Sequence, residues 1–185
     1  MGQGNKKSNI GRSKQGSSIC EMPVVLFVFF FGLLFPLADL SFIAFRTSFV
    51  HAAAQNALHS AVRAKTFQQN ATNGELSAIN IGRRDAISVR DNGISGVNFD
   101  DTDVNIAILG TPVKAGKAPI HSTSPLTSVE SKNYLYQVEV TVTGRVEPLI
   151  ALSSTLFGEV PGLTTPLPVQ ATYKQFVEHP EGLAM

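Results

Sequence analysis

The chain has 185 residues, a formal net charge of +1 and a single cysteine, Cys20, so no internal disulfide and no multi-cysteine metal site can form. The near-neutral balance lacks the basic face with interleaved aromatic residues that nucleic-acid binding needs, and we expect no nucleic-acid partner. Once the basic start and the apolar run after it are set aside, the remainder suits one domain of about 100 to 150 residues.

The amino-terminal segment, residues 1–16, is a short basic leader. It contains Lys6, Lys7, Arg12 and Lys14, and no acid occurs before Glu21. Positive charge on one side of an apolar run favours retention of that side in the cytoplasm. We therefore expect a cytoplasmic amino end and an extracytoplasmic carboxyl part.

The next predicted element is a membrane-spanning helix that starts at Met22 and carries no charge until Asp39. Its apolar run extends to Leu40, close to the length of about 20 residues that a helix needs to cross a bilayer. Pro23 is expected in the first turn, where proline is tolerated, whereas Pro36 should bend or loosen the helix. Asp39 is expected at the outer interface of the membrane.

A secretory signal peptide is an alternative interpretation of the same run, with a cut between Ala54 and Gln55. The apolar core is long for a signal, and Arg46 interrupts the segment before the cut. The alanines also continue at helical spacing beyond it. A lipoprotein signal fits less well, because the apolar run follows Cys20 where it should precede the cysteine.

A single acid, Glu21, stands at the edge of the apolar run, where an unpaired carboxylate costs about 2 to 4 kcal/mol. The order of basic leader, Gly16, Ser17 and then Glu21 before a long apolar helix resembles the type IV prepilin cleavage signature. The resemblance implies that prepilin peptidase cuts after Gly16, which makes Ser17 the mature amino terminus. Glu21 then pairs with the new ammonium group of the same or a neighbouring subunit, and this pairing lowers the cost of burying both charges.

The helix is expected to continue from Ser41 to about Gln69, because this stretch contains no proline or glycine. Asn73 and Gly74 supply the stop. Spacings of three and four residues predict one apolar face. Its members are Phe42, Phe45, Phe49, Ala52 and Asn56, with Leu58 and Val62 on a neighbouring stripe.

Four alanines and an arginine on this helix resemble those of the TadE and TadG group of tight-adherence pseudopilins. They are Ala53, Ala54, Ala57, Ala61 and Arg63. The tail is similar as well, with a strand at 136–142, a loop rich in leucine, proline and glycine at 148–168, a last strand at 171–173, and Glu178.

This second resemblance implies a membrane-anchored pseudopilin or minor pilin that acts in assembly of a tight-adherence, type IVc-like pilus and in cell adhesion. It implies a single-pass protein of the bacterial inner membrane that can enter the pilus. The implied partners are prepilin peptidase, other pilin or pseudopilin subunits, the pilus assembly machinery and the membrane.

Beyond Gly74 the pattern changes to short, half-buried strands. Alternation predicts strands around Ile87 and Val89, over 104–108, over 133–146 as a long central antiparallel strand, and over 169–177. A short helical turn is expected at 149–157. The predicted fold is α+β, with a basic leader at 1–16, a transmembrane and extended helix at 17–73, and an exported head domain with a small antiparallel β-sheet at 74–185.

One acidic segment imitates a calcium loop. Asp101, Asp103 and Asn105 alternate as calcium ligands do, but Ile106 stands where the loop needs glycine and Pro112 where it needs a bidentate glutamate. We therefore predict a turn followed by a strand.

No motif for catalysis, zinc binding or phosphate binding is present. His51 and His59 are assigned to the polar face of the helix, and His121 and His179 to separate loops. We expect neither an enzyme nor a cofactor or metal site. Two other classes stay open: a single-pass anchored extracytoplasmic binding domain unrelated to pili, and a secreted globular protein released at Ala54.

Overall fold

The computed structural model describes residues 17–93, 96–150, 155 and 158–184, with side chains from Met22 onward. The chain divides into two compact units, Met1–Ala38 and Asp39–Met185. We call the second one the head unit. It contains the predicted head domain, 74–185, together with the larger part of the long helix.

The described part of the first unit is helical throughout. It consists of α1 (Ser17–Phe27), a π-helical segment η2 (Val28–Leu34) and the first residues of α2 (Phe35–Arg63). In η2 the hydrogen bonds reach one residue further back than in an α-helix, and the Phe35 N–H bonds to the Phe30 carbonyl. Pro36 follows at once and has no N–H to donate. The predicted loosening of the helix at Pro36 is confirmed in this form.

Pro23 lies inside α1, because the helix already includes Ser17. The expectation that Pro23 occupies a first turn was wrong. The predicted helix starts at Met22, whereas residues 17–21 are helical too.

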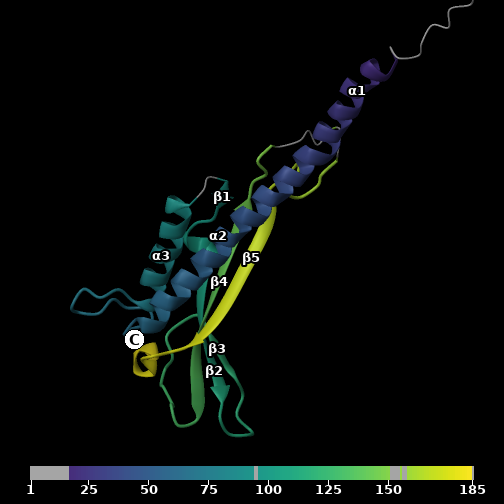
Figure 1. Ribbon diagram of the computed structural model, residues 1–185. Coiled ribbons are helices and arrows are strands. Elements are labelled where there is room, and N and C mark those ends of the chain that lie inside the picture. Colours follow the sequence, from purple (N-terminus) through teal and green to yellow (C-terminus); the bar gives the residue numbers. More distant parts are fainter. Residues whose placement is uncertain (1–16, 94–95, 151–154, 156–157, 185) are drawn as a thin grey trace, which may run out of the picture. The chain divides into compact units, whose positions relative to one another are not determined.

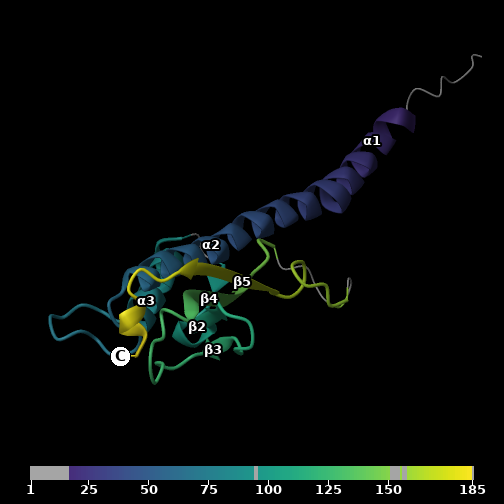
Figure 2. The ribbon, with the colours of Figure 1, turned by 90° about the horizontal axis from the view of Figure 1, so that it is seen from below.

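The head unit combines helices with one antiparallel sheet of five strands. The strands are β1 (Val97–Asn98), β2 (Val104–Pro112), β3 (Ile120–Ser122), β4 (Tyr134–Val146) and β5 (Leu167–Phe176). Its helices are α2 from Asp39 onward, α3 (Ala78–Asn92) and the 3₁₀ turns η3 (Asp101–Asp103) and η4 (Pro180–Ala184). Figures 1 and 2 show α2 and α3 on the same face of this sheet. The predicted α+β class is therefore confirmed.

Strand β4 is the centre of the sheet, as predicted. It pairs with β5 along one edge and with β2 along the other, while β1 continues the β2 edge at the far end, where Val97 lies opposite Val146. Its inward residues Tyr136, Val138 and Val140 are at most 5% exposed. The predictions of β2 and β5 are confirmed as well, whereas the helical turn predicted at 149–157 lies mostly outside the described residues.

Helix α3 replaces the strand that was predicted around Ile87 and Val89, so that prediction was wrong. The Ser77 side chain accepts a hydrogen bond from the Asn80 N–H (3.4 Å) and caps the helix. The buried positions Ala78, Gly82 and Ala86 recur every four residues. The burial of these small residues at helical spacing determines the structure of this segment, and the short alternation at Ile87 and Val89 does not.

Helix α2 ends at Arg63, before the predicted end near Gln69. Tertiary contacts explain the early stop. Phe67 is fully buried, and its N–H donates to the Gly182 carbonyl (3.1 Å), while the Thr66 carbonyl accepts from the Ala78 N–H (2.8 Å). A continuing helix would have used these backbone groups within itself.

The apolar face of α2 also differs from the predicted one. Phe42 and Phe45 are 42% and 50% exposed, and Asn56 is exposed. The predicted stripe of Leu58 and Val62 is buried, and the other buried apolar residues of α2 are Ile43, Val50, Ala53, Ala54, Ala57 and Ala61. Alanines suit this face of α2 because the sheet approaches it closely. A Cβ on Gly144 of β4 would lie 3.2 Å from Val50 Cγ2.

Candidate functional site

The segment from Met22 to Ala38 is a helix with an exposed apolar surface. Its large apolar side chains are exposed, from 40% for Phe35 to 66% for Met22, and none of its residues is charged. Within the described residues, one helix, Met22–Arg63, is long and apolar enough to cross a membrane, and its most apolar window has a mean hydropathy of 2.3. An apolar surface left open along a helix is suited to lipid or to other apolar helices.

Three phenylalanine rings reinforce the π-helical part of this segment. The Phe27 and Phe31 ring centres are 4.6 Å apart, and those of Phe31 and Phe35 are 5.1 Å apart. The rings follow one another along one side of the helix, across the stretch where the backbone turn is widened. Aromatic contacts of this kind add stability beyond the buried area itself.

The predicted processing and assembly residues lie at the start of the first unit. Gly16 is outside the described residues, and Ser17 is the first residue of α1. Glu21 belongs to the same helix, one turn after Ser17. The pairing of Glu21 with an amino group at Ser17 stays a prediction.

Asp39, the first residue of the head unit, is buried, and its predicted place at the outer interface of the membrane stays a prediction. It is 4% exposed, and its Oδ1 accepts a hydrogen bond from the Leu149 N–H (2.6 Å). Its Oδ2 is buried without a hydrogen-bond partner among the described residues. The carboxylate therefore ties the segment after β4 to the helix.

Arg46, two helical turns later, makes a second tie to the same segment. It is 7% exposed, and its Nη1 donates to the Glu147 carbonyl (2.5 Å). The guanidinium lies directly against Gly96, where an added Cβ would be 2.6 Å from Arg46 Cζ. Gly96 also has a φ of +96°, a conformation that other residues rarely adopt. We call Asp39 and Arg46, with the backbone of residues 147–149, the helix–loop anchor.

The sequence argument missed this anchor, although one signal for it is present. Asp39 and Arg46 are seven residues apart, which places both on the helix face that carries Val50 and Ala53. Charged residues on the stripe of small residues, and not opposite it, indicate specific buried partners.

Polar contacts fix the remaining length of α2 against β5. His51 is half-buried, and its Nδ1 lies 3.0 Å from the Tyr173 hydroxyl, whereas His59 is exposed. Arg63 Nε lies 3.8 Å from Glu178 Oε1, on the surface. Because His51 precedes Arg63 as Tyr173 precedes Glu178, α2 and β5 run in the same direction.

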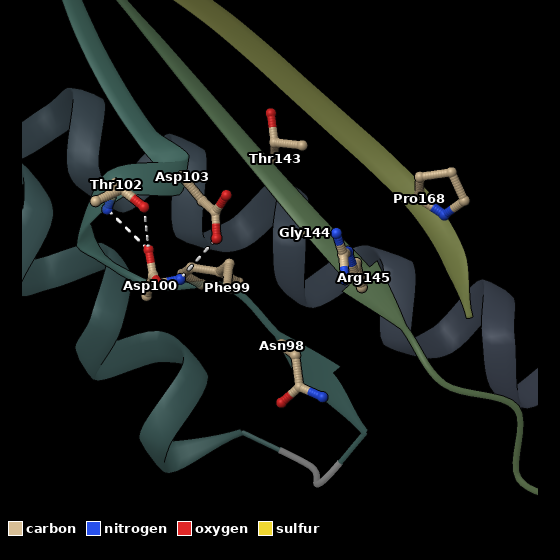
Figure 3. A pocket seen from close by; sticks show the side chains of 9 residues that line it. All are labelled: Asn98, Phe99, Asp100, Thr102, Asp103, Thr143, Gly144, Arg145 and Pro168. Atoms are coloured by element: carbon tan, nitrogen blue, oxygen red, sulfur yellow. Dashed lines mark hydrogen bonds between the residues drawn. The ribbon is translucent and has the colours of Figure 1, made fainter. Parts of the chain in front are cut away.

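An open depression lies on the sheet face away from α2, between η3 and the ends of β4 and β5 (Figure 3). Its acidic groups are already occupied. Asp100 accepts hydrogen bonds from the Thr102 hydroxyl (2.6 Å) and N–H (2.9 Å), which lower the pKa of its carboxyl, and the Asp103 carboxylate accepts from the Asp100 N–H (3.0 Å). The predicted turn followed by a strand is confirmed at η3 and β2.

Within the described residues, no group of three or more histidine, cysteine, aspartate and glutamate side chains converges as a metal site would require. His121 lies in β3, 3.6 Å from Glu139, which also pairs with Lys174 (2.7 Å), and His179 lies 3.4 Å from Glu181.

Comparisons with protein-family models, with curated proteins and with solved structures give no match to this chain. Its function is therefore argued from its own residues and their geometry.

Proposed function

We propose that the chain is a membrane-anchored pseudopilin or minor pilin of a tight-adherence, type IVc-like pilus, cut by prepilin peptidase after Gly16. The observation that carries the proposal is the division of the long helical region at Ala38. Before this residue the helix is apolar and exposed, and after it the helix forms the core of a sheet-containing unit. A pilin-like subunit needs both parts, one for the membrane and neighbouring helices and one for the exported head.

The contact between Arg63 and Glu178 supports the same proposal. The two residues belong to separate stretches that carry the resemblance to the TadE and TadG group, and their side chains meet at the end of α2. The four alanines of that resemblance are all buried on one face of α2. They fit the role of small residues that let the helix approach the sheet closely.

In this proposal the chain is not an enzyme but the substrate of one. Prepilin peptidase hydrolyses the bond between Gly16 and Ser17 at the cytoplasmic side of the inner membrane. The new ammonium group and Glu21 then form a charge pair within or between subunits. An unpaired charge is expensive beside lipid, so the pair favours one register of neighbouring helices.

The amino-terminal sequence and intact mass of the chain, extracted from membranes of its host, test the proposal. We expect a start at Ser17. A start at Met1 or Gly2 contradicts it and favours a single-pass anchored binding domain, and a start at Gln55 contradicts both in favour of a secreted protein.

Two substitutions sharpen this test. Gly16→Leu should abolish cleavage, whereas Gly11→Leu, a matched change within the leader, should leave it intact. Glu21→Gln should be cleaved but should lower subunit incorporation into pili by about tenfold or more, since a loss of about 1.4 kcal/mol corresponds to a factor of ten. Normal assembly of the Glu21→Gln variant would remove the assembly role of this residue.

A further inference from the structure

Exposed apolar side chains gather at the end of the head unit that follows Ala38. On α2 they are Leu40 (52% exposed), Phe42 (42%) and Phe45 (50%). On the segment after β4 they are Leu149 (46%) and Ile150 (43%). Large apolar residues grouped in this way on a surface mark a contact with an apolar partner.

The helix–loop anchor holds the second group beside the first. The Leu149 N–H donates to the carboxylate of Asp39, and the Glu147 carbonyl accepts from Arg46. Asp39 follows Ala38 directly in the chain. Leu149 and Ile150 therefore lie next to the end of the apolar run, whatever direction the head unit takes from there.

The length of the apolar run indicates what covers these residues. Met22–Ala38 gives about 25 Å of helix at about 1.5 Å per residue, and the hydrocarbon core of a bilayer is about 30 Å thick. Because the charged Glu21 bounds the run on its other side, we assign the missing thickness to the residues that follow Ala38, which are the first turns of the head unit. Asp39 lies in that zone, and the Leu149 N–H already satisfies one of its oxygens.

We infer that Leu40, Phe42, Phe45, Leu149 and Ile150 form a lipid-contacting rim that seats the head unit in the interfacial layer of the membrane. The inference rests on the membrane anchoring in the proposed function but not on cleavage at Gly16. Lipid is the occupant because the rim begins, in the chain, directly after the exposed apolar residues of 22–38. The apolar side chains of Phe42 and Phe45 can contact lipid at the edge of the hydrocarbon. The helix–loop anchor meanwhile keeps the carboxylate of Asp39 buried and away from lipid.

Site-specific fluorescence quenching in vesicles tests the rim. In the full chain with Cys20→Ser, single cysteines are introduced as Ile150→Cys, Leu149→Cys, Leu33→Cys or Val113→Cys and labelled with an environment-sensitive dye. Leu33 lies in the apolar run and is 59% exposed, and Val113 is 58% exposed at the opposite end of the sheet, where Pro112 pairs with Tyr134. The vesicles contain phosphatidylcholine and phosphatidylglycerol, with lipids spin-labelled near the headgroup or deep in the chains.

We expect deep quenchers to act on the dye at Leu33, and shallow quenchers to act at Ile150 and Leu149 at least twofold more than at Val113. If Leu33 is quenched but Ile150 and Leu149 behave like Val113, the rim is wrong and the membrane anchor stands. If Leu33 is not quenched, the anchoring itself is wrong. If the dye at Ile150 reports an apolar environment only when the protein-to-lipid ratio is high, the rim contacts a neighbouring subunit and not lipid, and the inference is overturned.

Discussion

Asp39 and Arg46 show how two charged side chains can be buried without pairing with each other. Each bonds to a backbone group of the segment after β4, and each keeps one buried polar atom without a partner among the described residues. A buried backbone amide that loses its acceptor costs about 1 to 3 kcal/mol. The helix–loop anchor is therefore sensitive to the loss of either side chain.

Replacement of Asp39 separates the effect of the acceptor from that of the charge. Asp39→Ala should destabilise the head unit by about 1 to 3 kcal/mol, because the Leu149 N–H loses its charged acceptor and the tie between helix and loop is broken. Asp39→Asn keeps an acceptor oxygen and removes a buried charge, so its effect should be clearly smaller. Denaturant unfolding of the full chain in detergent, followed by circular dichroism, measures both. Equal losses in the two variants would mean that the charge, and not the acceptor, matters.

Lys117 and Glu130 form an exposed ion pair (2.7 Å) near the turn before β4. The hydrogen bond from Lys117, and a second one from Asn133, lower the pKa of the Glu130 carboxyl, and the same bond with Glu130 raises the pKa of Lys117. The Glu130 contribution to stability is present above its unfolded pKa and is lost as the pH falls through the folded value. The Lys117 contribution is present below its unfolded pKa and is lost as the pH rises through the folded value.

Glu130→Gln should therefore destabilise the chain most near about pH 7, and the difference from the wild type should shrink toward both acid and strongly alkaline pH. The effect should be small and should weaken with added salt, because the pair is exposed. Thermal melts across pH measure it. Glu159→Gln is the control, since Glu159 is exposed and has no ion pair with any residue the structure describes. A pH-independent difference would exclude the ion pair as its cause.

At the scale of elements, alternation predicted strands well where one face of the strand is buried. Tyr136, Val138, Val140 and Val142 all point inward from β4, and the register with β2 and β5 follows from that pattern. The sequence could not place α3, because its buried residues are alanine and glycine and carry little hydrophobic signal. The packing of Gly82 against Ala61 and Ile106 becomes visible only in the fold.

The same limitation explains the wrong face of α2. Phenylalanine is the more hydrophobic residue, so Phe42 and Phe45 were predicted in the core, but the buried face of α2 carries alanines and aliphatic side chains, and the sheet approaches it closely. Of the candidate site, the exposed apolar helix at 22–38 was predictable from its length and lack of charge. The helix–loop anchor was not, because its partners are backbone groups more than a hundred residues away.

Ala57 and Asn56 give a matched test of the two faces. Ala57 is fully buried, and a Cβ on Gly82 of α3 would lie 3.3 Å from its carbonyl oxygen. Ala57→Leu should overpack this contact and destabilise the chain by about 1 to 3 kcal/mol or more. Asn56→Leu adds a similar side chain one position earlier, on the exposed face, and should change stability by less than about 0.5 kcal/mol. Chemical denaturation compares them, and the reverse order would restore the face predicted from the sequence.

At the scale of the molecule, the two units differ in whether they contain a buried apolar core. Among the described residues, the buried apolar core begins at Ile43 and ends at Leu183, and all of it belongs to the head unit. The apolar run before Asp39 contributes no buried apolar side chain to that core. Under the proposed function, its stability comes from lipid or from neighbouring helices. The helix α2 beyond Asp39, in contrast, supplies one wall of the core.

Two truncations should therefore behave in opposite ways. A fragment that starts at Asp39 keeps every buried core residue and should unfold in one cooperative transition, in mild detergent because the rim is still exposed. A fragment that starts at Ala64 lacks the α2 residues from Ile43 to Val62, which leaves inward side chains such as Val140 and Val142 uncovered. We expect it to show no dispersed amide spectrum and no sharp melt. Cooperative unfolding of the shorter fragment would mean that the sheet and α3 form a sufficient core, and α2 would then be a docked element that the head does not need to fold.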